Sequence, residues 1–366
     1  MKHPIKNFIT LLLPAALGCS MAYQNAYATP LPIGSITGAT SVTCPSGAAT
    51  GATCKHITVT GCKTASGGAL PDLGVTIGIT RATSPKGTII LHSGGPATGF
   101  FNDNGFPDYY VGQGYNVIQM AWDQGVSSQG WNSDGNGVLY HACRPATVFQ
   151  WLYNNFHSSG AFCGQGISGG AAVFAYALAH YQNTVSGHTT ETQQYLFDYV
   201  LMASGPANAR MDVGCDTSVY NNQNIVNCGV TSYPNSSKGT PFYGFAAGGN
   251  PIDIWEGTST CGTSNPPTAD VNTWARDSVI STGPNAHTGV FSYGQTNISF
   301  YFCGSTTNNQ SLGLSWLLTQ KITPKNTPLP INCFTQCTDE SVWNDANAVA
   351  QTKSDMAKYC VLNTHT

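Results

Sequence analysis

A serine between glycines, in residues 166–170 (Gly-Ile-Ser-Gly-Gly), is the feature that most constrains how this chain folds. The pattern G-x-S-x-G occurs once in the sequence. Residues 161–163 before it form a short apolar run, and the alanine-rich residues 171–179 after it favour a helix. Glycine is required where a turn is tight, because neighbouring backbones then pass too close for a side chain. The pattern therefore predicts a strand, a sharp turn that carries Ser168, and a helix.

A second glycine-rich segment lies upstream and also follows an apolar run. Residues 88–91 (Thr-Ile-Ile-Leu) are typical of a short buried strand, and residues 92–96 (His-Ser-Gly-Gly-Pro) come directly after them. Together with the serine turn, this segment resembles the α/β-hydrolase superfamily, in which a glycine-rich loop follows the third strand. The resemblance implies an α/β fold with a mostly parallel sheet flanked by helices.

The resemblance also implies roles for particular residues. In that superfamily the serine of the turn is the nucleophile, and backbone N–H groups bind the oxyanion that forms during acyl transfer. Carried onto this chain, Ser168 is the candidate nucleophile, and the oxyanion donors are Gly169 and either Gly94 or Gly95. His92 is expected to orient the loop and to take no direct part in catalysis.

The other apolar runs extend the α/β pattern along the chain. Strands are expected at residues 75–79, 115–120, 199–203, 298–302 and 330–334, and helices at residues 144–156, 312–318 and 342–359. We divide the chain into a targeting segment (1–28), a disulfide-tied N-terminal extension (29–72), two parts of an α/β-hydrolase core (73–206 and 297–366) and an inserted cap (207–296). The cap is expected because an unstructured loop of that length is improbable in a compact domain.

The first 28 residues have the features of a secretory signal peptide. Lys2 and Lys6 precede an apolar core at residues 8–18, and residues 26–28 (Ala-Tyr-Ala) form a small-x-small cleavage site. Cleavage is expected after this site, and the rival interpretation is a lipoprotein cut before Cys19. The expected location is therefore secreted or periplasmic, with no integral membrane segment after signal removal.

The cysteine count agrees with export from the cytoplasm. The chain has 13 cysteines, and removing Cys19 with the signal peptide leaves 12, an even number that allows up to six disulfides. Cys143 and Cys163 flank the helix expected at residues 144–156, so one of these disulfides is expected between them. No C-x-x-C pair occurs, so neither a metal site nor another cofactor is expected.

Charged residues are scarce in this chain. They make up 8% of it, against about 25% in an average globular protein. The net charge is −3 and no basic patch occurs, so nucleic-acid binding has no electrostatic support. A hydrophobic fraction of 41% argues against disorder. No feature of the sequence sets an oligomeric state.

The catalytic base and acid do not stand where the resemblance places them. In the superfamily the chain order is serine, acid, histidine, with the histidine after the last strand and before the final helix. Here residues 303–309 contain no carboxylate after the late strand, and residues 339–340 (Asp-Glu) occupy the place of the histidine. The candidate bases are His365, ranked first, then His287, with Glu340 third as a base or orienting acid.

The ranking of His365 depends on a disulfide. A bond from Cys360 to Cys333 or Cys337 would bring the end of the chain toward the loop that normally carries the histidine. Asp212, which follows the strand at residues 199–203, is a further candidate for the acid.

Two functional hypotheses follow, an enzyme and a binding protein. The first is a secreted serine hydrolase that cleaves a small-molecule or polymeric ester through an acyl-enzyme on Ser168, with a neutral lipid, polyester or plant polymer as substrate. The second is a non-catalytic α/β-hydrolase-like protein, for example a carbohydrate-binding one, that has lost the usual acid and histidine. The intact turn around Ser168 favours the hydrolase.

Overall fold

The computed structural model describes residues 29–95, 97–123, 130–132, 135–181, 196–216, 218, 251–303, 310–337 and 341–362. The predicted signal peptide, a large part of the predicted cap, and the candidate bases His365 and Glu340 lie outside the described residues.

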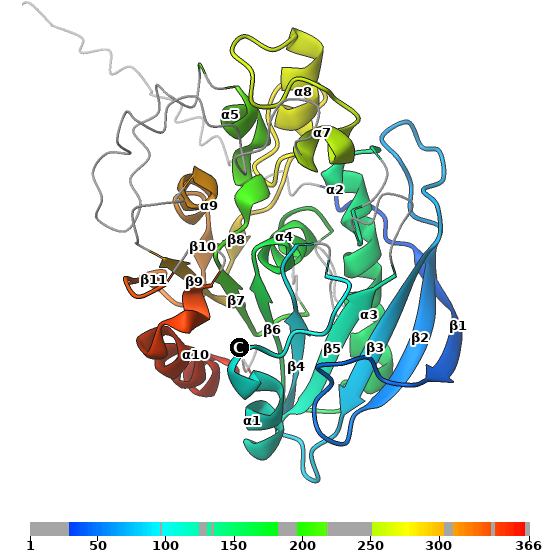
Figure 1. The fold of residues 1–366 in the computed structure, drawn as a ribbon, viewed down its shortest axis with the longest axis vertical. Coiled ribbons are helices and arrows are strands. Elements are labelled where there is room, and N and C mark those ends of the chain that lie inside the picture. The colour runs from blue at the N-terminus through cyan, green and yellow to red at the C-terminus, as the bar shows by residue number, and fades with distance from the viewer. Residues whose placement is uncertain are drawn as a thin grey trace, which may run out of the picture.

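A nine-stranded sheet forms the centre of the described part of the chain (Figure 1). In spatial order its strands are β1 (Ser35–Val42), β2 (Thr53–Thr60), β3 (Leu73–Thr80), β5 (Asn116–Trp122), β4 (Gly87–His92), β6 (Ala161–Ile167), β7 (Tyr199–Ala203), β9 (Asn297–Cys303) and β11 (Ile331–Phe334). Pairing is antiparallel from β1 through β3 to β5 and parallel from β5 to β11. A separate parallel pair joins β8 (Ser292–Tyr293) to β10 (Thr323–Pro324). The mostly parallel sheet predicted from the sequence is confirmed.

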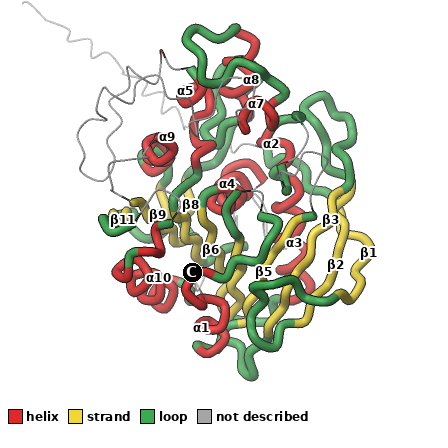
Figure 2. Tube along the Cα trace, viewed as in Figure 1, coloured by secondary structure: helices red, strands yellow, loops and turns green. Residues whose placement is uncertain are grey.

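Helices cover both faces of this sheet (Figure 2). They are α1 (Phe106–Gly112), α2 (Val138–His141), α3 (Cys143–Phe156), α4 (Gly169–Tyr176), α5 (Met211–Cys215), α7 (Pro251–Glu256), α8 (Thr268–Asp277), α9 (Gln310–Thr319) and α10 (Ala346–Tyr359), with short 3-10 or π segments η1 (Asp103–Gly105), η2 (Ala177–Tyr181), η4 (Ala207–Arg210) and η7 (Val342–Asn344).

On β6, Gly164 lies against Phe174 of α4, whereas Gln165 accepts a hydrogen bond from Tyr110 of α1. Successive residues of a strand point to opposite faces, so α4 and α1 lie on opposite sides of the sheet.

Aromatic side chains fill the space between the sheet and helices α3 and α4. The rings of Phe149 and Phe174 stack with their centroids 4.9 Å apart, and Phe197 meets both of them edge-on. Every residue of β6, β7 and β9 is buried, as expected for parallel strands that are covered on both faces. This packing holds the β6–α4 unit rigidly in the centre of the molecule.

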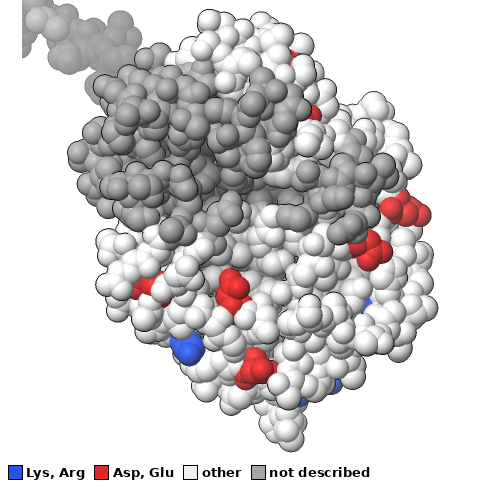
Figure 3. All heavy atoms as spheres, viewed as in Figure 1, with Lys and Arg blue, Asp and Glu red and all other residues white. Residues whose placement is uncertain are grey.

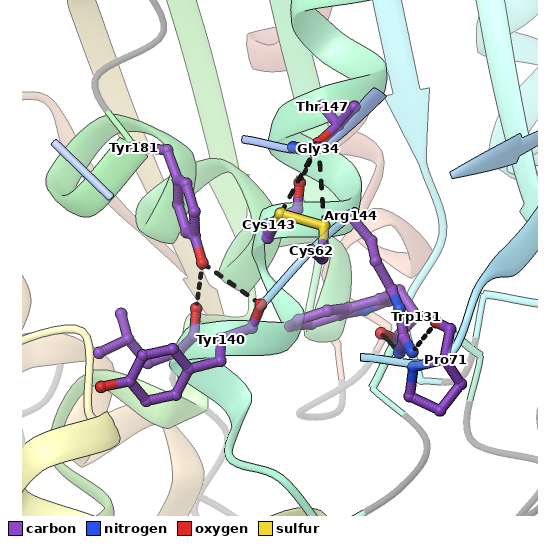
Figure 4. The surroundings of a disulfide bond; sticks show 10 residues. Gly34, Cys62, Pro71, Trp131, Tyr140, Cys143, Arg144, Thr147 and Tyr181 are labelled. Carbon is purple, nitrogen blue, oxygen red and sulfur yellow. Dashed lines mark hydrogen bonds between the residues drawn. A yellow bond between two sulfur atoms is a disulfide. The ribbon is translucent and has the colours of Figure 1, made fainter. Parts of the chain in front are cut away.

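The N-terminal extension is part of the main sheet, although its sequence does not indicate these strands. β1 and β2 pair in order with β3, and a disulfide ties Cys62, just after β2, to Cys143 at the start of α3 (Figure 4). Gly34 N–H donates to Thr147 Oγ1 over 2.8 Å, and Arg144 donates to the Pro71 carbonyl over 2.8 Å. The extension therefore contributes strands, and polar contacts fasten it to α3.

Five disulfides are formed among the described cysteines. They join Cys44 to Cys54, Cys62 to Cys143, Cys163 to Cys360, Cys215 to Cys261 and Cys303 to Cys337. The expected bond between Cys143 and Cys163 is wrong, because Cys163 lies on the face of β6 opposite to α3 and there meets Cys360. The bond considered from Cys360 to Cys333 or Cys337 is also wrong, because Cys360 is bonded to Cys163.

The Cys163–Cys360 disulfide closes a much longer loop than Cys44–Cys54, with sequence separations of 197 and 10. Loop-closure entropy then predicts stabilisation of about 5 kcal/mol for the first and about 3 kcal/mol for the second. We expect the double variant Cys163→Ala/Cys360→Ala to lose more unfolding free energy in urea than Cys44→Ala/Cys54→Ala. The opposite order would contradict the prediction.

Candidate active site

Ser168 lies in a strained turn between β6 and α4. Its backbone angles are φ 52° and ψ −115°, a left-handed φ that is uncommon for a residue with a side chain. The turn is held because Ser168 N–H donates to the Ala203 carbonyl over 2.8 Å and the Ser168 carbonyl accepts from Ala172 N–H over 3.1 Å. The residue is 9% exposed. Strain of this kind persists only where the surroundings enforce it, and it is concentrated at functional sites.

Glycines allow the backbone to pass closely on both sides of Ser168. A Cβ atom on Gly170 would lie 2.5 Å from the His92 carbonyl oxygen and 2.7 Å from that of Ser93. A Cβ atom on Gly166 would overlap the Gly170 carbonyl across the turn. Gly170 is therefore required by contact between the turn and the loop after β4, and Gly166 is required by contact within the turn itself.

The glycine loop after β4 lies directly beside the nucleophile candidate. A Cβ atom on Gly94 would be 3.1 Å from the Ser168 Cβ atom. A Cβ atom on Gly169, the first residue of α4, would be 3.3 Å from the Gly95 nitrogen. The structure thus brings Ser168 together with Gly169, Gly94 and Gly95, the glycines among which the two oxyanion donors are predicted, at the amino end of α4, where helical N–H groups favour an anion.

His92 is engaged in holding this loop. Its Nε2 atom accepts a hydrogen bond from Trp122 Nε1 over 2.9 Å, and its Nδ1 atom donates to the Ser93 carbonyl over 2.8 Å. Burial lowers the pKa of His92 to about 4, although its hydrogen bond to Ser93 acts in the opposite direction. A neutral imidazole with both nitrogens occupied positions the loop and has no free lone pair for a serine proton.

His287 is held away from Ser168. Its Nδ1 atom is 3.0 Å from His180 Nδ1, and its Nε2 atom is 3.0 Å from the Thr29 carbonyl oxygen. His180 lies twelve residues after Ser168 on the same helical segment, and a rise of 1.5 Å per residue places it about 18 Å away. The position of His287 therefore conflicts with its predicted role as the base. The segment 279–290 packs against η2, and this packing holds His287 far from Ser168.

Three further candidates for the base or the acid remain: His365, Glu340 and Asp212. His365 and Glu340 lie outside the described residues. Cys360 is bonded to Cys163 in the first half of β6, whereas Ser168 follows the end of that strand, so the disulfide that supported His365 does not form. Asp212 is paired with the Arg210 guanidinium, with N–O distances of 2.6 and 2.8 Å.

A second turn packs against Ser168 and was not recognised in the sequence. Ser204, directly after β7, also has a left-handed φ of 47°, and its N–H donates to the Tyr301 carbonyl over 2.8 Å. A Cβ atom on Gly205 would lie 2.8 Å from the Ser168 carbonyl oxygen. Ser204 Oγ is buried without a hydrogen-bond partner in the described part of the chain. The available signal was the run Ser-Gly-Pro that follows a buried strand.

The parallel sheet with helices on both faces, the strained serine between strand and helix, and the glycine loop beside it define the α/β-hydrolase fold. No protein-family model matches the chain, and no curated protein matches it. Among solved structures it is similar to brefeldin A esterase, a bacterial homologue of human hormone-sensitive lipase, with 11% identity, coverage of 88% of this chain and 79% of that chain, and a TM-score of 0.46.

Two further solved structures are similar to this chain. Candida antarctica lipase A has 11% identity, covers 84% of this chain and 79% of its own, and gives a TM-score of 0.47. The Pyrobaculum calidifontis esterase has 9% identity, coverage of 84% and 86%, and a TM-score of 0.45.

The contact between Gly170 and the loop after β4 is open to a direct test. In Gly170→Ala the added methyl group meets two backbone oxygens, and we expect a net loss of about 2 kcal/mol in unfolding free energy despite the helix propensity that alanine gains. The matched control is Gly112→Ala in α1, where a Cβ atom meets nothing within 4 Å. Urea unfolding midpoints of the two variants check this, and equal midpoints would contradict the geometry.

Proposed function

We propose that this protein is a serine hydrolase that cleaves carboxylic esters through an acyl-enzyme on Ser168. The observation that carries the proposal is the strained Ser168 turn, with the Gly169 and Gly95 backbones packed against each other beside it. A protein that only binds its ligand has no chemical use for a serine held in a strained, left-handed turn beside a glycine loop.

The proposed reaction needs a nucleophile, an oxyanion site and a base. Ser168 Oγ attacks the ester carbonyl carbon while its proton passes to the base, and the N–H groups of Gly169 and of Gly94 or Gly95 bind the oxyanion. The C–O bond to the alcohol then breaks, and the base returns the proton to the leaving alcohol. Water repeats the sequence on the acyl-enzyme and releases the acid.

The base is proposed to be His365 or Glu340. Of the three ranked candidates, His287 has both ring nitrogens engaged in other hydrogen bonds, which leaves His365 and Glu340. A histidine has a suitable pKa without adjustment, whereas a glutamate must be buried to accept a serine proton near neutral pH. His365 therefore keeps the first rank on chemical grounds alone.

An uncharged ester is the proposed substrate, either small or polymeric. Charged residues are 8% of the chain, and Figure 3 shows the described Lys, Arg, Asp and Glu side chains as isolated groups on the visible face. A surface with so few charges offers little attraction to an ionic substrate. A neutral lipid, a polyester or a plant polymer fits this surface.

The proposed location is outside the cytoplasm. Ten of the eleven described cysteines form the five disulfides given above, and the eleventh, Cys333, is disulfide-bonded as well; this state persists in oxidising compartments. The signal peptide proposed at residues 1–28 would provide the route. Within the described residues, no helix has both the length and the apolar character needed to cross a bilayer.

Ser168→Ala is expected to abolish both turnover of short-chain aryl esters and labelling by a fluorophosphonate, because it removes the hydroxyl that stands beside the oxyanion donors. Loss of a triad serine typically costs about 10⁶-fold in kcat. The matched control is Ser204→Ala, which removes the neighbouring strained serine and should keep the label. Labelling that persists in Ser168→Ala and disappears in Ser204→Ala would reassign the nucleophile.

The base is tested by esterase rates of His365→Ala, Glu340→Gln and His287→Ala. We expect a loss of about 10³-fold or more in one of the first two variants and little change in the third. His287→Ala serves as the control because that side chain is held at the far end of the helix. A wild type that neither turns over esters nor takes the label would favour the non-catalytic binding protein.

A further inference from the structure

Two carboxyl groups are buried together where the α7–α8 segment meets α2. Glu256 is the last residue of α7 and Asp277 the last residue of α8, and they are 6% and 0% exposed. Both belong to residues 207–296, which were predicted to form a cap, and Figure 1 shows α7 and α8 next to each other beyond α2. Burial of a carboxylate costs free energy unless the group is paired with a cation or is protonated.

The two carboxyl groups enclose the start of α2. Glu256 Oε1 accepts a hydrogen bond from Val138 N–H over 2.9 Å, and Gly137 N–H donates to the Trp255 carbonyl over 3.0 Å. A Cβ atom on Gly137 would overlap Asp277 Oδ2 and lie 3.4 Å from Glu256 Oε2. The two carboxyl groups therefore lie where the ends of α7 and α8 meet the start of α2, and Glu256 is hydrogen-bonded to α2 directly.

Among the described residues, only one cation balances the two carboxyl groups. The Arg276 guanidinium donates to both oxygens of Asp277, over 2.6 and 2.7 Å, and it also lies over the ring of Tyr140 of α2. The other described titratable groups facing the pair are hydroxyls: Tyr140 from α2, Tyr176 from α4 and Tyr181 from η2. The Tyr176 hydroxyl donates to the Asp277 backbone carbonyl over 2.6 Å and so does not neutralise either carboxylate.

The side chains of Glu256 and Asp277 lie close together, because a Cβ atom on Gly137 would meet a carboxyl oxygen of each, Asp277 Oδ2 and Glu256 Oε2. Glu256 Oε2 has no donor among the described protein groups, and two carboxylate oxygens can share a hydrogen bond only when one of them carries a proton. Burial raises the pKa of Glu256 well above its usual range, and the negative charge of Asp277 raises it further.

We propose that a proton on Glu256 forms a pH-dependent clamp that fastens the α7–α8 segment to α2, and that removal of this proton releases the segment. Ionised Glu256 places a second negative charge beside Asp277, with Arg276 already committed, and the repulsion separates the α7–α8 segment from α2. The clamp operates whether or not Ser168 is catalytic.

The pH dependence has a defined direction. Because the folded-state pKa of Glu256 is raised, its stabilising effect is complete below the unfolded-state pKa of about 4.3 and is lost as pH rises toward the folded-state value. In this window the unfolding equilibrium constant of the wild type should rise relative to Glu256→Gln by up to about tenfold per pH unit. The glutamine side chain of this variant keeps the shape of a protonated glutamate and cannot ionise, so the slope of the variant lacks this contribution.

The experiment compares the disulfide-intact wild type, Glu256→Gln and Asp253→Asn by urea unfolding from pH 5 to 9. Asp253 is a matched control, since it is a buried acid on the same helix whose Oδ1 already accepts from Thr258 Oγ1 and Cys261 N–H. We expect Asp253→Asn to keep the wild-type slope. Hydrogen exchange, corrected for intrinsic rates, should rise with pH at residues 135–142 and 251–257 in the wild type and less in Glu256→Gln.

Identical pH slopes in the wild type and Glu256→Gln would overturn the proposal. If Glu256→Gln does not fold, infrared spectroscopy of the wild type decides the matter. A carbonyl band of a protonated carboxyl group at pH 7 that disappears at higher pH, together with faster exchange at residues 135–142, supports the clamp. Absence of that band at pH 7 refutes it.

Discussion

The close approach of three backbone turns at Ser168 is the constraint on which the rest of the structure depends. The turn from β6 to α4, the loop after β4 and the turn after β7 meet at distances that leave no room for a Cβ atom on Gly170 or Gly205. These contacts exist because β4, β6 and β7 are parallel neighbours whose carboxyl ends reach the same edge of the sheet. The position of the nucleophile candidate is therefore a consequence of the strand order.

Packing on both faces of the sheet stabilises the strained turn at Ser168. The ends of β6 and the body of α4 are fixed by the aromatic cluster around Phe149, Phe174 and Phe197. On the other side of the sheet, the Cys163–Cys360 disulfide and the hydrogen bond from Tyr110 to Gln165 hold α10 and α1 against β6. The left-handed backbone of Ser168 costs about 1–3 kcal/mol of conformational free energy. The packing of β6 and α4, which are buried on both faces of the sheet, offsets this cost.

Because the chain has few charged residues, each buried ionisable group must be compensated by the few polar or charged groups beside it. Asp355 accepts hydrogen bonds from Tyr301 and Ser299 and fixes α10 on β9. Asp277 is matched by Arg276, whereas Glu256 beside it has no cation of its own among the described residues. A chain with few charges has few ions to compensate such a group, so a proton must do so. The α7–α8 segment and α2 are in this way coupled through one titratable contact.

The sequence by itself determined the α/β class, the strand at residues 199–203 and the turn at Ser168, because these depend on local patterns of apolar residues and glycine. It also indicated the glycine loop, since a buried strand followed by two glycines is a local signal. Only the tertiary structure decided the disulfide partners, the sheet pairing of residues 35–60, and the location of His287. Each of these depends on which face of the sheet a side chain reaches and on contacts between segments far apart in the chain. A pattern in the sequence does not show such contacts, and the buried carboxyl groups of Glu256 and Asp277 meet only because folding brings the ends of α7 and α8 together.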